Sequence, residues 1–360
     1  MDQRKNSPIV KVFDFFSGCG GTSYGFQKAG MEITYALDHD KDSSLSFKAN
    51  FPNSHFEFVD IREVDIKSLL GKVKSEYPNP VLFSGCAPCQ PFTKQNTTRP
   101  KIDQDERVPL ITYFLKIIEQ SKPDLVFLEN VPGLQKLDAE SEPFGEFLKT
   151  LNQEGYELDF CPIKLANYGI PQSRRRLVLV ASRHGSIKLP KETHGPGTAN
   201  SNYSTVRDWI AHFPKIKAGE EHKKIPNHKA AKLSELNLKR IKATPEGGGN
   251  RDWPISLQLN CHKGFSGFTD VYGRMWWDKP SSGLTTRCIS YSNGRFGHPE
   301  QNRAISIREA ASLQTFPENY IFRGNMNSIA RQIGNAVPVR LAELVGKCFI
   351  NHLKERERLT

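Results

Sequence analysis

Residues 9–21 read IVKVFDFFSGCGG, an apolar run that passes directly into a glycine-rich turn. The apolar part is typical of a short buried strand, and the pattern of Tyr24, Phe26 and Ala29 after the turn predicts a helix. A strand, a glycine turn and a helix open many nucleotide-binding α/β folds, because glycines let backbone N–H groups approach a ligand closely. The turn has neither Gly-x-Gly-x-x-Gly nor P-loop spacing, so a helix-start turn without a ligand stays open.

The same alternation continues through the first half of the chain. Apolar runs and helical patterns follow one another at residues 33–37, 56–59, 66–73, 81–84, 109–119 and 124–128. This order predicts an α/β fold with a doubly wound, mostly parallel sheet and with its loops along one edge. Asp38 follows the glycine turn by about 20 residues, where a carboxylate can accept hydrogen bonds from a ribose. The pattern favours an adenosine cofactor, although a solvated carboxylate at a strand end would give the same pattern.

Cys89 lies on a polar loop directly after the apolar run at 81–84. Open α/β folds bind ligands at the carboxyl edge of the sheet, so Cys89 is the first candidate nucleophile. Cys86 and Cys89 also have the spacing of a redox dithiol or of half a zinc site. The other five cysteines are scattered singly, which disfavours zinc, and a thioredoxin-like domain would leave most of the 360 residues unexplained. We therefore expect no metal.

Composition and charge indicate a soluble protein that meets a polyanion. Hydrophobic residues make up 37% of the chain and charged residues 25%, and no run of about 18 apolar residues occurs, so we expect a cytoplasmic protein without a membrane partner. Residues 185–330 contain 21 Lys and Arg against 12 Asp and Glu, whereas the rest of the chain has 29 against 27. The segment is also rich in Gly and Pro. A basic, loop-rich second domain is typical of nucleic-acid recognition, although a solvated lysine-rich surface gives the same count.

Two further segments carry candidate catalytic residues. Glu129 and Asn130 follow the run at 124–128, at the same predicted sheet edge as Cys89, where a carboxyl group can act as an acid or merely accept solvent hydrogen bonds. Three arginines at 174–176 lead into another apolar run, and a solvated basic cluster is the commoner meaning of such a sequence. Ser306 and Glu309 have capping-box spacing and predict the start of a helix.

Taken in order, these segments resemble the DNA (cytosine-5)-methyltransferases, and the resemblance covers nearly the whole chain. Six motifs carry it: FDFFSGCGG at 13–21, Pro88-Cys89-Gln90, Glu129-Asn130-Val131, QSRRR at 172–176, REAASLQTFP at 308–317 and QIGNAV at 332–337. The resemblance implies a Rossmann-like class I methyltransferase fold. Residues 1–184 and 331–360 would form the catalytic domain, and residues 185–330 a smaller, loop-rich DNA-recognition domain.

The family chemistry gives each motif a role. Cys89, with Gln90 beside it in the motif, would add to C6 of cytosine and make C5 nucleophilic. Glu129 would be protonated and donate to N3, and Arg176 would contact O2. Arg174 would support Cys89 or Glu129, and Asn130 would hold the loop.

The same resemblance implies S-adenosylmethionine as the cofactor, with S-adenosylhomocysteine as the product. Asp38 would bind the ribose and Asp60 the adenine amine. The full set of implied cofactor-binding residues is Phe16, Gly18, Gly20, Gly21, Asp38, Asp60, Ile61, Leu110, Asn335 and Val337.

The implied partner is double-stranded DNA, from which the target cytosine would be flipped. We expect a monomer, associated with the nucleoid, and leave open a cognate restriction endonuclease. A tRNA (cytosine-5)-methyltransferase is the alternative within the fold, although its Cys-Phe-Thr tripeptide is only approximated by Gly267-Phe268-Thr269. A catalytically silent DNA-binding protein is the alternative outside the class of enzymes.

Overall fold

The computed structural model describes residues 9–87, 109–132, 143–259 and 270–358, so Cys89 and Gln90 lie outside the described residues. The chain divides into two compact units. Unit 1 contains residues 1–163, 175–191 and 339–360, and unit 2 contains residues 164–174 and 192–338. These boundaries differ from the predicted ones chiefly at residues 164–174 and 331–338, which belong to unit 2. Residues 164–174 belong to unit 2 because they are hydrogen-bonded to other parts of that unit. For example, Nε2 of Gln172 donates to the backbone carbonyl of Leu313 at 2.9 Å.

Unit 1 is built on a seven-stranded sheet in the order β3-β2-β1-β4-β5-β7-β6. The pairs among β1 to β5 are parallel, and β7 runs antiparallel to β5, so the predicted mostly parallel α/β sheet is confirmed. The strand order reverses between β1 and β4, where doubly wound sheets bind ligands. The strands are β1 Lys11–Phe15, β2 Glu32–Asp38, β3 His55–Phe58, β4 Val81–Gly85, β5 Leu125–Asn130, β6 Glu157–Lys164 and β7 Arg175–Ser182.

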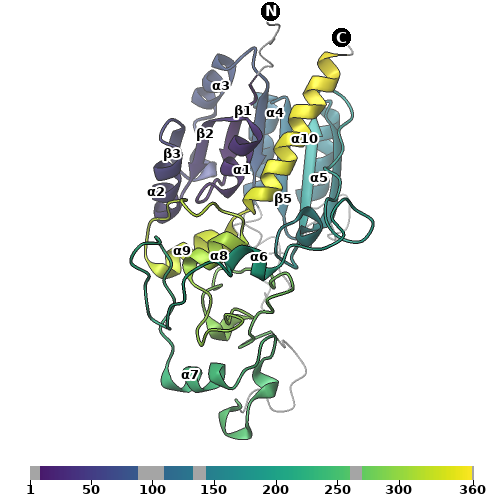
Figure 1. The fold of residues 1–360 in the computed structure, drawn as a ribbon. Coiled ribbons are helices and arrows are strands. Elements are labelled where there is room, and N and C mark those ends of the chain that lie inside the picture. The colour runs from purple at the N-terminus through teal and green to yellow at the C-terminus, as the bar shows by residue number, and fades with distance from the viewer. Residues whose placement is uncertain (1–8, 88–108, 133–142, 260–269, 359–360) are drawn as a thin grey trace, which may run out of the picture. The chain divides into compact units, whose positions relative to one another are not determined.

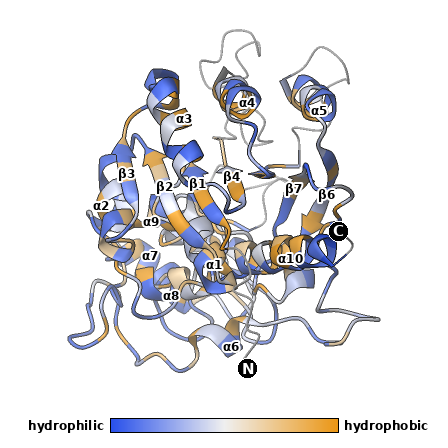
Figure 2. Cartoon of the chain, turned by 90° about the horizontal axis from the view of Figure 1, so that it is seen from above, coloured by the Kyte–Doolittle hydropathy of each residue, from blue (hydrophilic) through white to orange (hydrophobic). Residues whose placement is uncertain are grey.

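Helices cover both faces of this sheet (Figure 2). On one face lie α3, α4 and α5, and their apolar side chains form one buried cluster with Phe13, Phe15 and Phe83 of the sheet. On the other face lie α1 and α10. The helices of unit 1 are α1 Gly21–Ala29, α2 Lys41–Asn50, α3 Ile66–Ser75, α4 Pro109–Ser121, α5 Pro143–Gln153 and α10 Val339–Glu357, with a 3₁₀ turn at η1 Ile61–Glu63.

The last helix, α10, packs beside the first helix, α1, in unit 1 (Figure 1). The approach is close because both helices present glycine at the contact. A Cβ atom added to Gly25 would meet Ala342 and Glu343 of α10, and one added to Gly346 would lie 2.7 Å from the Cβ of Ala29. Of the predicted C-terminal part of the catalytic domain, residues 339–357 therefore pack in unit 1, whereas residues 331–338, with Asn335 and Val337, belong to unit 2.

Unit 2 contains short helices joined by long loops, as its composition predicts. Its described core includes an apolar cluster of Ile241, Trp253, Tyr291 and Ala304. The helices are α6 Val206–Ile210, α7 Glu235–Lys242, α8 Ile307–Leu313 and α9 Met326–Asn335, with 3₁₀ turns η5 Leu165–Tyr168, η6 Asn250–Asp252, η7 Ile255–Leu257 and η9 Tyr291–Asn293.

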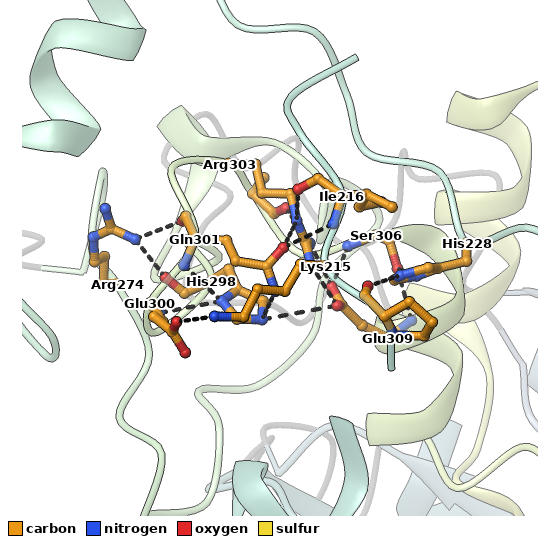
Figure 3. Close-up of polar contacts among 12 residues, drawn as sticks. Lys215, Ile216, His228, Arg274, His298, Glu300, Gln301, Arg303, Ser306 and Glu309 are labelled. Carbon is orange, nitrogen blue, oxygen red and sulfur yellow. Dashed lines mark hydrogen bonds and ion pairs between the residues drawn. The ribbon is translucent and has the colours of Figure 1, made fainter. Parts of the chain in front are cut away.

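A buried ion pair lies at the start of α8 in unit 2 (Figure 3). The guanidinium of Arg303 donates twice to the carboxylate of Glu309, with both distances 2.7 Å, and both side chains are almost fully buried. Glu309 also accepts from the backbone N–H of Ser306 at 2.7 Å, while its own N–H donates to the Ser306 hydroxyl. The predicted capping box is therefore confirmed, and its glutamate has a second role as the partner of a buried arginine.

Among the helices of the described residues, none combines the length and the apolar character that crossing a membrane would require.

Candidate cofactor and catalytic sites

The glycine turn after β1 has the backbone that its sequence predicts. Phe16, Gly18 and Gly20 have φ values of 59°, 54° and 93°, so three of five consecutive residues are left-handed. Gly20 is the N-cap of α1. The backbone N–H and the hydroxyl of Ser17 both donate to the carbonyl of Leu37, at 3.0 and 3.1 Å. The turn is therefore bonded to the end of β2, beside the reversal in strand order.

Asp38 ends β2 and faces this turn. Its Oδ2 accepts from the N–H of Gly18 and its Oδ1 from the N–H of Asp40, both at 2.8 Å. Burial raises the pKa of the carboxyl group, while these two backbone donors oppose the shift. Both oxygens keep a lone pair for a further donor. The arrangement fits a carboxylate oriented to accept hydrogen bonds from a ribose.

Asp60 caps the 3₁₀ turn η1, and its neighbour Arg62 occupies its carboxylate. Nε and Nη2 of Arg62 donate to it at 2.9 and 2.8 Å, and this pairing lowers the pKa of Asp60. A donor from an adenine would share the carboxylate with this guanidinium. Ile61 and Leu110 are buried and belong to one apolar cluster, so these two predicted cofactor contacts lie in the same part of unit 1.

A carboxyl group that the motif analysis left without a role lies inside β1. Asp14 is fully buried and accepts from the hydroxyl of Ser23 in α1 at 2.5 Å and from that of Ser84 in β4 at 2.9 Å. Burial raises its pKa to about 7. The sequence did hold a signal for it, because an aspartate in an apolar strand must be paired or neutral. It connects the helix after the glycine turn to the strand that leads toward Cys89.

Glu129 and Arg176 form a buried ion pair at the carboxyl end of β5. Nε of Arg176 lies 2.6 Å from Oε1 of Glu129, and each side chain is about 11% exposed. Burial raises the pKa of Glu129, and the charge and hydrogen bond of Arg176 act in the opposite direction. Arg176 comes from β7, which pairs with β5 in antiparallel register. Two of the predicted catalytic residues are thus in direct contact.

Asn130 connects this pair to the end of β4. Its Nδ2 donates to the carbonyl of Ala87 at 3.3 Å, and its Oδ1 accepts from the N–H of Val131 at 2.8 Å. These bonds fit the predicted role of Asn130 in holding the loop that carries Cys89. Cys86 is half-buried beside Thr22, and desolvation keeps the pKa of its thiol well above the usual value, so its thiol does not readily form a thiolate.

Three predicted site residues lie in unit 2. Nη1 of Arg174 donates to the carbonyls of Leu284 and Gly334, at 2.6 and 3.1 Å, so its described bonds are to backbone of unit 2 and not to Glu129. Asn335 ends α9 and Val337 is buried. The predicted support of Cys89 or Glu129 by Arg174, and the cofactor contacts of Asn335 and Val337, stay predictions.

Comparison with known proteins identifies what this arrangement is similar to. The family model described as C-5 cytosine-specific DNA methylase matches residues 10–351. The Type II methylase M.HgiDII of Herpetosiphon aurantiacus is 40% identical over 98% of this chain and 99% of its own length. The Type II methyltransferase M1.HphI of Haemophilus parahaemolyticus is 30% identical over 95% of this chain and 87% of its own length.

Solved structures agree at the level of the fold. A prophage-encoded protein of E. coli, assigned as a DNA modification methyltransferase, matches with a TM-score of 0.74 and 21% identity over 96% of this chain and 99% of its own. A variant of Spodoptera frugiperda DNMT2 matches with a TM-score of 0.63 and 20% identity, over 94% of this chain and 99% of its own.

Proposed function

The chain belongs to the C-5 cytosine-specific DNA methylase family and is a DNA (cytosine-5)-methyltransferase, and from this premise we propose how it works and on what. It transfers a methyl group from S-adenosylmethionine to C5 of a cytosine flipped out of a specific site in double-stranded DNA, through a covalent bond between Cys89 and C6. The observation that supports the mechanism best is the buried Glu129–Arg176 pair at the carboxyl end of β5.

The thiolate of Cys89 adds to C6, and the electron pair displaced from the C5–C6 bond makes C5 nucleophilic. C5 would then take the methyl group as its bond to the sulfonium sulfur breaks, and S-adenosylhomocysteine would be the leaving group. Loss of the proton from C5 and expulsion of the thiolate restore the aromatic ring and free Cys89. Because a base inside a duplex offers no access to C6, the target cytosine must first leave the stack.

Glu129 is the group that neutralises charge on the ring. Burial raises its pKa and so makes protonation easier, and the protonated carboxyl group would donate to N3 as the sulfur adds to C6. Arg176 orients this carboxyl group through the 2.6 Å contact and has further donors for O2 of the base. Asn130 keeps the end of β4 in place through the carbonyl of Ala87.

The residues around the glycine turn fit an adenosine-containing cofactor. Asp38 presents two oriented carboxylate oxygens, and the left-handed turn at Gly18 and Gly20 leaves room for a close backbone approach. S-adenosylmethionine would supply the electrophilic methyl group. Phe16, Gly21, Asp60, Ile61, Leu110, Asn335 and Val337 complete the proposed set of cofactor contacts.

Unit 2, which carries most of the net positive charge of the chain, would supply the phosphate contacts that position the DNA and the base contacts that specify the site. We place the protein in the cytoplasm with the nucleoid and expect it to act as a monomer. A restriction endonuclease that cleaves the same site fits the Type II names of the relatives.

Labelled methyl transfer to duplex DNA and to tRNA, offered in parallel, tests the proposed substrate. We expect label at C5 of cytosine in the duplex alone; label in tRNA alone would overturn the choice of DNA.

Variants test the roles of the two catalytic side chains. Cys89→Ser should bind DNA and cofactor but transfer no methyl group. Full activity of this variant would refute the assignment of Cys89 as the nucleophile. Glu129→Gln keeps a donor but has no acidic proton, so we expect roughly a 10²- to 10⁴-fold loss of kcat with DNA binding retained. Wild-type kcat should fall as the pH rises through the raised pKa of Glu129.

A further inference from the structure

Unit 2 contains a cavity of about 760 Å³ whose lining lies outside the six motifs, apart from Ser173. It is lined by aromatic and ionised side chains from residues 202–208 and 270–295, with Ser173 at its edge. Three cations, Arg207, Lys279 and Arg295, are matched by the three carboxylates Asp208, Asp270 and Asp278. Because these charges balance, the lining suits a neutral group with mixed donors and acceptors better than a phosphate.

Two cationic side chains of this lining, Arg207 and Lys279, are exposed. Lys279 lies over the ring of Trp276, whereas Arg207 is held by hydrogen bonds to a carboxylate. Its Nε and Nη2 donate to the two carboxylate oxygens of Asp278, at 2.6 and 3.0 Å. Its guanidinium carbon lies 5.3 Å from the ring centroid of Trp277, so an aromatic face also restricts it. Arg295 differs, because it is almost buried and donates to backbone carbonyls and to Asp270.

The backbone beneath Arg207 is fixed as well. Its N–H donates to the carbonyl of Trp277 at 2.9 Å, and the N–H of Val206 donates to that of Lys279 at 3.0 Å. Thr205 and Asp208 form a capping box at the start of α6. The segment that carries Arg207 is thus bonded to the segment that carries Asp278, and little side-chain freedom remains to be lost on binding.

The geometry of the pair leaves one edge of the guanidinium available. Asp278 occupies the Nε and Nη2 side, and within the described residues Nη1 has no hydrogen-bond partner. The side chain of Arg207 is 50% exposed. The free edge therefore presents two parallel N–H donors, from Nη1 and Nη2, to a ligand. In duplex DNA, O6 and N7 of guanine form the matching pair of acceptors on the major-groove side.

We propose that Arg207, held by Asp278 and Trp277, is a specificity-determining residue that reads one guanine in the recognised DNA site. The proposal rests on the proposed function, since it assumes that duplex DNA is the substrate. An exposed ion pair with no ligand would contribute little to stability, so the double restraint on an exposed guanidinium is better explained by recognition.

The test begins with the wild-type protein. Methylation-aware sequencing of DNA from cells that express the chain gives the target site. The kcat/KM for methyl transfer is then measured on the cognate duplex and on duplexes in which each G·C pair, except that of the target cytosine, is replaced by A·T. Arg207→Ala, Asp278→Asn and the control Lys215→Ala are compared, the last removing an exposed ion pair with Glu300 in the same unit.

In Arg207→Ala we expect discrimination at one guanine to fall from roughly 5- to 150-fold to within about twofold, with the other positions unchanged. Asp278→Asn should weaken discrimination at the same position. Lys215→Ala should discriminate at every guanine as strongly as the wild type. Thermal denaturation shows whether each variant is folded. If Arg207→Ala does not fold, the discrimination of Asp278→Asn still tests the proposal.

Two results would overturn the inference while leaving the enzyme a DNA methyltransferase. One is unchanged discrimination at every guanine in both variants. The other is an equal loss on all duplexes, which would identify Arg207 as a phosphate contact. Absence of methyl transfer by the wild-type protein on any duplex would instead overturn the proposed function, and this inference with it.

Discussion

Asp14 is a carboxyl group inside the sheet whose two hydroxyl partners come from α1 and β4. Its pKa in the folded protein is raised to about 7, against an ordinary value of 3.8, chiefly by burial. The unfolded chain therefore loses this proton at a lower pH than the folded protein does. The contribution of Asp14 to stability is complete below about pH 4 and is lost as the pH rises through 7.

Replacing Asp14 by Asn should remove this pH dependence, because an amide can bond both hydroxyl groups without ionising. The difference between about 7 and 3.8 corresponds to about 4 kcal/mol, so we expect the contribution of Asp14 to the free energy of unfolding to fall by up to that amount between pH 4 and 8. Urea unfolding at several pH values measures it. Asp42→Asn, at a partly exposed position of α2, is the matched control. An Asp14→Asn variant with the wild-type pH profile would contradict this explanation.

Residue-level chemistry was partly predictable from the sequence. Glu129, Arg176 and Asp38 could be placed from the sequence, because Glu129 and Asp38 lie at the end, and Arg176 at the start, of strands that read as apolar runs. The partners of Arg174 were not predictable, since Leu284 and Gly334 are more than 100 residues away along the chain. The Arg207–Asp278 pair spans 71 residues and has no local signal for the same reason.

At the scale of elements, the contact between α1 and α10 depends on glycine. A Cβ atom on Gly25 would lie 2.5 Å from the Cβ of Ala342 and 2.7 Å from the N of Glu343. Neither neighbour can move without shifting the α10 backbone. Gly71 in α3 has no atom near its would-be Cβ within 4 Å, which makes it a matched control in a helix of the same unit.

We expect Gly25→Ala to destabilise the protein by about 1–3 kcal/mol through overpacking. Gly71→Ala should stabilise it by about 0.4–1 kcal/mol, because alanine restricts the unfolded chain and fits the helix. Urea unfolding of both variants measures the difference. Equal effects of the two substitutions would show that α1 and α10 do not pack as described.

The buried ion pair between Arg303 and Glu309 at the start of α8 leads to a second prediction at the scale of elements. Arg303→Met would leave the Glu309 carboxylate buried without its partner, at a cost of about 3–5 kcal/mol. His298, 3.8 Å from Glu309, has its pKa lowered to about 3 by burial and so carries no charge at neutral pH in the wild type.

Adding Glu309→Gln to Arg303→Met should recover much of this loss, because glutamine keeps the capping oxygen for Ser306 without a charge. Thermal unfolding of the single and double variants tests it. A double variant less stable than Arg303→Met would argue against an unpaired charge as the cause.

At the scale of the whole molecule, alternating apolar runs were sufficient to predict the sheet, because strands buried on both faces read as continuous apolar sequence. They did not predict the place of β7 between β5 and β6, which depends on pairing and not on composition. Residues 164–174 belong to unit 2, unlike in the predicted division of the chain, since Gln172 and Arg174 donate hydrogen bonds to backbone carbonyls more than 100 residues away.

The central claim for the whole protein is the transient bond between Cys89 and C6 of the target cytosine. A duplex with 5-fluorocytosine at the target position tests it most directly, because C5 then carries no proton to lose and the thiolate cannot leave. With S-adenosylmethionine present, we predict a complex that survives denaturant, has the mass of chain, strand and one methyl group, and maps to Cys89. Efficient methylation of the parent duplex with no such complex would contradict the account.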